Sequence, residues 1–156
     1  MLRWIILTAS HGLMLAIGFA AGIYLLPILI APPGPDAAML AETARSATYS
    51  ADFRRDLRGS DFLHWGEGTV SVSATQIIHQ GRLSPGPDYK LYLAPDFVED
   101  EEQFLALKER AELIGDIKTF GGFLIDVPPA VEVEAYTTVV VWCETFSEFI
   151  SAAKYR

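Results

Sequence analysis

The longest apolar run of the chain lies at its N-terminus. From Trp4 to Ala31, 28 consecutive residues carry no charged side chain. About 20 helical residues, rising roughly 1.5 Å each, cross the hydrocarbon core of a bilayer, so this run is long enough to span it even when tilted. A cleaved signal peptide usually has a shorter apolar region of about 7–15 residues, and Ala31-Pro32-Pro33 is a poor cleavage context. The pattern therefore predicts an uncleaved transmembrane helix, a signal-anchor, over residues 4–31.

The residues before this run predict the orientation of the anchor. Arg3 and the free amino group precede it, and no other basic residue follows until Arg45. Basic flanks favour the cytoplasmic side of a membrane. We therefore expect residues 1–3 in the cytoplasm, and the chain beyond the anchor outside it, in the periplasm or the extracellular space.

A spacer separates the predicted anchor from the rest of the chain. The Pro-Pro-Gly-Pro sequence at residues 32–35 ends the helix, because proline cannot continue it, and begins a stiff segment. We place this Pro-, Gly- and Ala-rich spacer at residues 32–46, with the part from Asp36 to Ala47 helical or loosely ordered. Residues 47–156 then form one domain, which is long enough for a modest hydrophobic core.

Within the domain the hydrophobic pattern changes to short alternating segments. Polar and apolar residues alternate from Gly68 to Ser73, as in a half-buried strand. Dense turn sequences such as Ser84–Asp88 separate this segment from others like it. Further strands are predicted at residues 75–83, 89–93, 120–127, 131–134, 136–143 and 149–155. Many short strands divided by Gly and Pro indicate a mainly β fold, either a small β-sandwich or an open barrel.

One segment of the domain has helical spacing instead. Its apolar residues recur at i, i+3, i+7 and i+10, namely Phe104, Leu107, Ala111 and Ile114. Asp100, three residues before Gln103, resembles a capping box, and Gly115 is placed to end the helix. The acidic run at residues 99–102 suits the positive end of a helix dipole and lacks the spacing of a calcium loop. We expect one inserted amphipathic helix and no metal site here.

Charge and cysteine content restrict the function further. All 20 acidic residues and 11 of the 12 basic residues follow Ala31, so the domain side of the chain has a net charge of −9. Such a surface is a poor partner for nucleic acid. With one Cys and three His, metal sites built from several such ligands are excluded. The phosphate loop, the Cys-x-x-Cys pair and the Gly-x-Ser-x-Gly elbow are also absent.

Cys143 remains as the candidate for chemistry. Four apolar residues precede it, which predicts a strand buried on both faces. A period of two places Val139, Val141 and Cys143 on one face and Val140 and Trp142 on the other. The thiol is then either buried and inert, paired between chains, free and reactive, or a cofactor ligand. Glu144, the acidic neighbour, would raise the pKa of this thiol.

Three blocks of the domain resemble the DM-thirteen domain family. They are GRLSPGPDYKLYL at residues 81–93, GDIKTFGGF at 115–123 and VVWCETF at 140–146. The resemblance covers about Tyr49 to Tyr155. Members of that family occur beside DOMON domains in extracellular proteins and are proposed to take part in electron transfer.

The resemblance implies a redox role for Cys143, the Cys of the Trp-Cys block. It would act as a bare thiol or as a ligand to a prosthetic group such as haem. His64 and His79 are the remaining candidates for a second haem ligand on the domain side. Because no DOMON domain is present in this sequence, the redox partner would be a separate protein.

Two other interpretations stay open. The domain could be a non-catalytic binding or interaction module of the cell envelope that presents turns such as Ser84–Asp88. The anchor, which contacts membrane lipid, could also form a homodimer through Gly18 and Gly22, because small residues four apart let two membrane helices approach closely.

Overall fold

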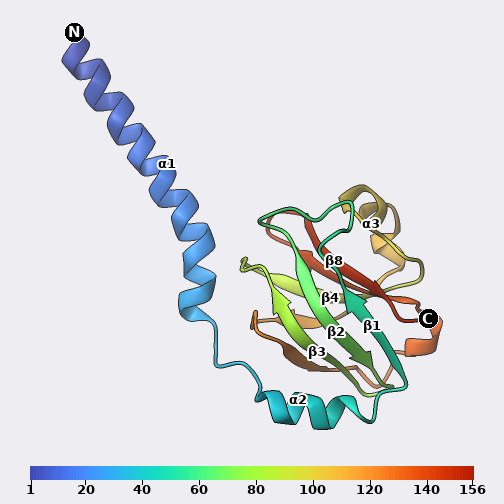
Figure 1. The fold of residues 1–156 in the computed structure, drawn as a ribbon. Coiled ribbons are helices and arrows are strands. Elements are labelled where there is room, and N and C mark those ends of the chain that lie inside the picture. Colours follow the sequence, from blue (N-terminus) through green and yellow to red (C-terminus); the bar gives the residue numbers. More distant parts are fainter.

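Two antiparallel four-stranded sheets form the domain, and the computed structural model describes every residue from 1 to 156. The first sheet has the order β1-β2-β3-β6, with β1 at Tyr49–Phe53, β2 at Gly66–Val72, β3 at Gln76–Leu83 and β6 at Phe123–Asp126. The second has the order β5-β4-β7-β8, with β4 at Tyr89–Ala94, β5 at Glu112–Ile117, β7 at Thr138–Cys143 and β8 at Glu148–Lys154. The sheets pack face to face without closing into a barrel (Figure 1), which confirms a mainly β, sandwich-like fold.

Helix α1 (Leu2–Ile30) extends away from the sandwich (Figure 1). It is the one helix long and apolar enough to cross a membrane, and it agrees with the predicted segment. At a rise of 1.5 Å per residue its 29 residues measure about 43 Å. The hydrocarbon core of a bilayer is roughly 30 Å thick, so about 13 Å of α1 can lie outside that core.

Helix α2 (Ala37–Ala44) is the helical part of the spacer. Asp36 caps it by accepting hydrogen bonds from the backbone N–H groups of Ala38 and Met39. Helix α2 packs against β3 on the outer face of the first sheet, and its Leu40 is only 3% exposed there. Only six residues, 31–36, separate α1 from this docked helix, and six residues reach at most about 20 Å. The domain is therefore held close to the end of α1.

Apolar side chains form two clusters, one between the sheets and one on the outer face of the second sheet. Helix α3 (Glu101–Leu107) covers the outer cluster. Within it, the ring of Phe104 lies between Tyr92 and Trp142, with centroid distances of 5.3 Å and 4.9 Å. The second sheet is thus buried on both faces where α3 covers it.

Strand β7 lies between these two clusters, which explains its continuous apolar sequence. Val139, Val141 and Cys143 face the inter-sheet core, whereas Val140 and Trp142 face the outer cluster. All six residues of the strand are buried. The alternation predicted around Cys143 is confirmed.

The predicted inserted helix is present but shorter than expected. The helix ends at Leu107 and a 3₁₀ turn follows. Ile114, the last residue of the predicted apolar stripe, lies in β5 and faces the inter-sheet core. Pairing of β5 with the edge of β4 overrides the helical spacing, and Gly115 belongs to that strand instead of ending a helix. The side chain of Asp100 does cap the helix, accepting from the backbone N–H of Gln103 at 2.9 Å.

The predicted strand at residues 131–134 is wrong. The backbone N–H of Val131 donates to the carbonyl of Pro128, which closes a turn, and Val133–Ala135 form a 3₁₀ turn. Val133 is buried there, so its apolar character reflects the packing of a turn. Conversely, β1 was not predicted; its short alternating sequence pairs with β2 at the edge of the first sheet.

Candidate functional site

Cys143 lies at one end of the sandwich, where three connections of the chain meet. They are the loop between β1 and β2, the turn between β3 and β4, and the turn between β7 and β8. Together with α1 they surround a cavity of about 450 Å³. Its lining residues are Ala20, Ile23 and Tyr24 of α1 and Leu63, His64, Pro85, Gly86, Pro87, Tyr89, Cys143, Phe146, Glu148 and Ile150 of the domain. We call it the Cys143 cavity.

The Pro-Gly-Pro turn between β3 and β4 is fixed by hydrogen bonds to its neighbours. Ser84 exchanges backbone and side-chain hydrogen bonds with Trp65 of the β1–β2 loop, and its hydroxyl lies 3.3 Å from that of Tyr89. A Cβ atom on Gly86 would lie 2.4 Å from the Tyr89 hydroxyl, so the ring of Tyr89 requires glycine there. Asp88, which ends the turn, has a left-handed backbone with φ of 54°. The cavity therefore has a rigid wall.

The thiol of Cys143 is buried in this wall and held by the turn. The residue is 2% exposed, and its Sγ donates to the carbonyl oxygen of Pro87 at 3.1 Å. Burial raises the pKa of Cys143; backbone hydrogen bonds from Phe146 and Thr145 oppose this effect, and the carboxylates of Asp88 and Glu148 add to it. No Lys or Arg lines the cavity. The sulfur is accordingly a thiol at neutral pH.

Glu144 follows Cys143 in the sequence but points away from its thiol. Its carboxylate lies on the other face of the sheet, where it accepts from the Tyr92 hydroxyl and from Lys108 Nζ at 2.7 Å. Burial opposes its ionisation, but these two donors hold the pKa of Glu144 below its ordinary value. Sequence reasoning missed this cluster, because Lys108 and Tyr92 are 36 and 52 residues from Glu144 and the three meet only in the folded domain.

The two candidate histidines lie in different places. His64 lines the Cys143 cavity, with its Nδ1 3.1 Å from a carboxylate oxygen of Asp61. His79 is fully buried between the rings of Phe53 and Phe123, and its Nε2 lies 3.0 Å from the carbonyl oxygen of Glu67. The fold thus brings His64 to the same cavity as Cys143 and places His79 in the core.

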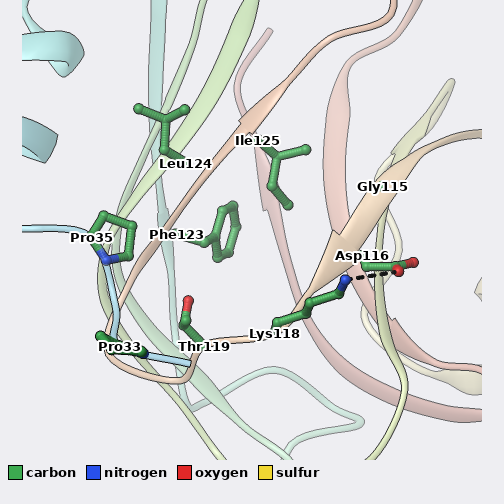
Figure 2. A pocket seen from close by; sticks show the side chains of 9 residues that line it. All are labelled: Pro33, Pro35, Gly115, Asp116, Lys118, Thr119, Phe123, Leu124 and Ile125. Atoms are coloured by element: carbon green, nitrogen blue, oxygen red, sulfur yellow. Dashed lines mark ion pairs between the residues drawn. The ribbon is translucent and has the colours of Figure 1, made fainter. Parts of the chain in front are cut away.

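A second, wider cavity of about 600 Å³ lies between the spacer and the edge strands β5 and β6. Figure 2 shows Pro33 and Pro35 on one side of it and Phe123 pointing into it. Its charged groups are paired, since Asp116 binds both Lys118 and Lys90. Because no thiol or imidazole lines it, this cavity is a weaker candidate than the Cys143 cavity.

The residues around Cys143 do not fit a haem. A cysteine ligand must lose its proton, which the raised pKa of Cys143 opposes. Haem also carries propionate carboxylates, and the cavity has no Lys or Arg to pair with them; its acidic residue is Glu148. His79 is out of reach in the core. Nowhere do three His, Cys, Asp or Glu side chains gather closely enough to hold a metal ion.

Comparison with known proteins assigns the domain to a family. No curated protein and no solved structure matches the chain. The model of a protein family described as electron transfer DM13 matches residues 56–155. This stretch contains β2 to β8 and every domain residue that lines the Cys143 cavity, whereas α1, the spacer and β1 lie outside it. Because the match covers well over half of the chain, and includes all three sequence blocks noted above, the chain belongs to the DM13 electron-transfer family.

Proposed function

We propose that this chain is a membrane-anchored electron-transfer module whose domain lies outside the cytoplasm and whose redox site is the Cys143 cavity. The family description supports an electron-transfer role in general. The observation that carries the specific proposal is that the only cysteine of the chain lines a cavity between the domain and α1. Redox function at this sulfur therefore has a defined site with room for a partner molecule.

The composition supports the proposed membrane topology. Arg3 precedes the apolar helix, and basic flanks favour the cytoplasm. The strongly acidic domain follows, with a net charge of −9 after Ala31. Its acidity favours solubility and a redox partner with a basic face.

The state of the thiol favours a bound redox group over direct thiol exchange. In thiol exchange the Cys143 thiolate would attack a partner disulfide, form a mixed disulfide and release a partner thiolate that takes up a proton. Burial and the raised pKa of Cys143 keep the thiolate scarce. Electrons would instead pass between two envelope redox proteins through a group held in the cavity beside the sulfur.

Spectroscopy and redox titration of the full-length protein test this proposal. The protein should be purified from its native membranes in mild detergent, and its absorption followed during reduction with dithionite and reoxidation with ferricyanide. We expect a redox-dependent spectral change that Cys143→Ser removes. Val141→Ala is the matched control, because Val141 faces the same core two residues earlier in β7 and its loss leaves the sulfur in place.

Thiol labelling gives a second measurement. A maleimide should react with native Cys143 slowly and with the unfolded chain rapidly, because the thiol is buried. Rapid labelling of the native protein at neutral pH would instead support direct thiol exchange. A spectrum without a redox-dependent change, together with slow native labelling, would contradict an electron-transfer role for Cys143.

The buried thiol also favours a second candidate function, a non-catalytic binding module. An unpaired Cys with a raised pKa packs as a small hydrophobe. The rigid Ser84–Asp88 turn would then be the presented surface. In that case Cys143→Ser should lower stability by about 1–3 kcal/mol through an imperfectly paired hydroxyl, without changing any redox property.

A further inference from the structure

We propose that the Cys143 cavity binds the uncharged ring of a membrane-dissolved redox lipid of the quinone class, which enters from the bilayer beside α1. This inference rests on the proposed function for the position of the domain at the membrane. It adds the class of ligand and the path by which that ligand arrives.

The cavity is open toward the segment that would lie in the membrane. Ala20, Ile23 and Tyr24 of α1 form one of its sides. An adjoining groove continues along α1, where Gly22 and Leu26 face Pro87 and Phe146 of the two turns. A molecule dissolved in the bilayer could therefore reach the Cys143 cavity along α1 without crossing water.

The rim of the cavity is apolar on the domain side as well. Leu63 and Phe146 line it and are 39% and 47% exposed, and Phe62, next to Leu63, is 85% exposed. Large apolar side chains gathered on loop tips beside a membrane helix are suited to the interfacial region of a bilayer, where aromatic rings are favoured. With the excess length of α1 at its C-terminal end, these loops would lie at the headgroup level.

The charges around the cavity select against anionic ligands. Glu148 is the acidic residue of the lining, and the carboxylate of Asp88 lies close enough to act on the Cys143 thiol. No Lys or Arg is present to balance a phosphate or a carboxylate of a ligand. Flavin nucleotides and haem carry such groups, whereas a quinone ring carries no charge.

The polar atoms that remain suit the oxygens of a quinone or its reduced form. With Nδ1 of His64 donating to Asp61, Nε2 is left to accept a hydrogen bond from a hydroquinone hydroxyl. The rings of Tyr89 and Phe146 supply flat apolar contact beside it. Apolar walls with a few polar atoms are typical of small-molecule sites of this size.

A photoreactive azido-ubiquinone tests the proposal on the full-length chain in phosphatidylcholine nanodiscs. Cross-links located by mass spectrometry should fall on residues 84–89 or 143–150, and decylubiquinone should compete for them. Ala20→Trp places a bulky ring against the cavity from α1 and should weaken this competition at least about tenfold. Leu25→Trp is the matched control, because Leu25 is on α1 but lines no part of the cavity, and it should label like the wild-type chain.

Three results would overturn the proposal. They are labelling that decylubiquinone does not reduce, equal labelling of Ala20→Trp and wild-type chains, and competition by haemin or flavin mononucleotide but not by decylubiquinone. The assay measures no electron transfer. A chain that binds the quinone yet shows no redox change dependent on Cys143 would retain this inference and lose the proposed function.

Discussion

The imidazole ring of His79 lies against the ring of Phe123, with their centroids 5.1 Å apart. Phe53 packs on the imidazole at the same distance, and the Nδ1 atom has no hydrogen-bond partner. A protonated ring would place a positive charge among aromatic side chains with one donor unsatisfied. Burial accordingly lowers the pKa of His79 below its ordinary value of 6.5.

This burial predicts acid sensitivity. The unfolded chain takes up a proton at His79 at higher pH than the folded domain does. Stability is therefore complete above about pH 6.5 and declines as the pH falls toward the lowered pKa, by at most about 1.4 kcal/mol per pH unit from this group. Urea unfolding of the full chain in detergent, followed by circular dichroism between pH 8 and 5, measures the slope.

His79→Gln should flatten that slope, whereas His64→Gln should leave it in place, because His64 is outside the core. An unchanged slope in His79→Gln would mean that carboxylates cause the acid sensitivity.

A second prediction concerns the close approach of β2 and β3 at a pair of glycines. Gly68 and Gly81 are opposite each other, and a Cβ on Gly81 would lie 2.0 Å from the carbonyl oxygen of Glu67 and 2.7 Å from Nε2 of His79. Gly81→Ala should therefore lower the free energy of unfolding by about 3 kcal/mol or more. Gly121→Ala, where no atom lies within 4 Å of the added Cβ, should be nearly neutral in the same denaturation assay.

A third prediction concerns the docking of α2. Leu40→Ala should lower the free energy of unfolding by about 2–3 kcal/mol, because the side chain is buried against the first sheet. Met39→Ala, at a position 48% exposed on the same helix, should change it by no more than about 0.5 kcal/mol. Equal effects of the two substitutions would mean that α2 does not dock in solution.

The fourth prediction concerns self-association through Gly18 and Gly22. Neither glycine has an atom within 4 Å of an added Cβ, but both face the groove that Phe146 and Pro87 border. If a second α1 helix occupies this face, replacing both glycines with Ile should weaken dimerisation in a membrane two-hybrid assay. Gly12→Ile is the control, since Gly12 has the same free space and lines neither cavity nor groove. Unchanged dimerisation would mean that Gly18 and Gly22 form no helix–helix interface and face only the domain's own loops.

Local patterns in the sequence were sufficient to predict β7 and its two faces. An uninterrupted apolar run has few alternatives to a strand covered on both sides, and α3 provides the second cover. The residue at which α3 ends could not be predicted from local patterns. Phe104 and Ile114 fit one helical stripe, yet they pack in different clusters, because pairing of β5 with β4 depends on residues far along the chain.

The sequence identified Cys143, His64 and the Ser84–Asp88 turn separately, but not that they meet at one cavity. Cys143 followed from the Trp-Cys block, but the cavity depends on three connections that meet in space. Nothing local distinguishes His64, which lies at that cavity, from His79, which lies in the core. The carboxylates that act on the thiol are those of Asp88, at the end of the β3–β4 turn, and Glu148, at the start of β8, whereas Glu144 points to the opposite face.

The short connection between α1 and the docked α2 has a consequence for how the domain meets its partners. With α1 in a bilayer, a connecting segment of at most about 20 Å keeps the domain within one protein diameter of the lipid surface. Encounters then occur by diffusion in two dimensions, at the high effective concentration that such confinement gives. A partner that is itself anchored in the membrane meets this domain far more often than an equally abundant protein that is free in solution.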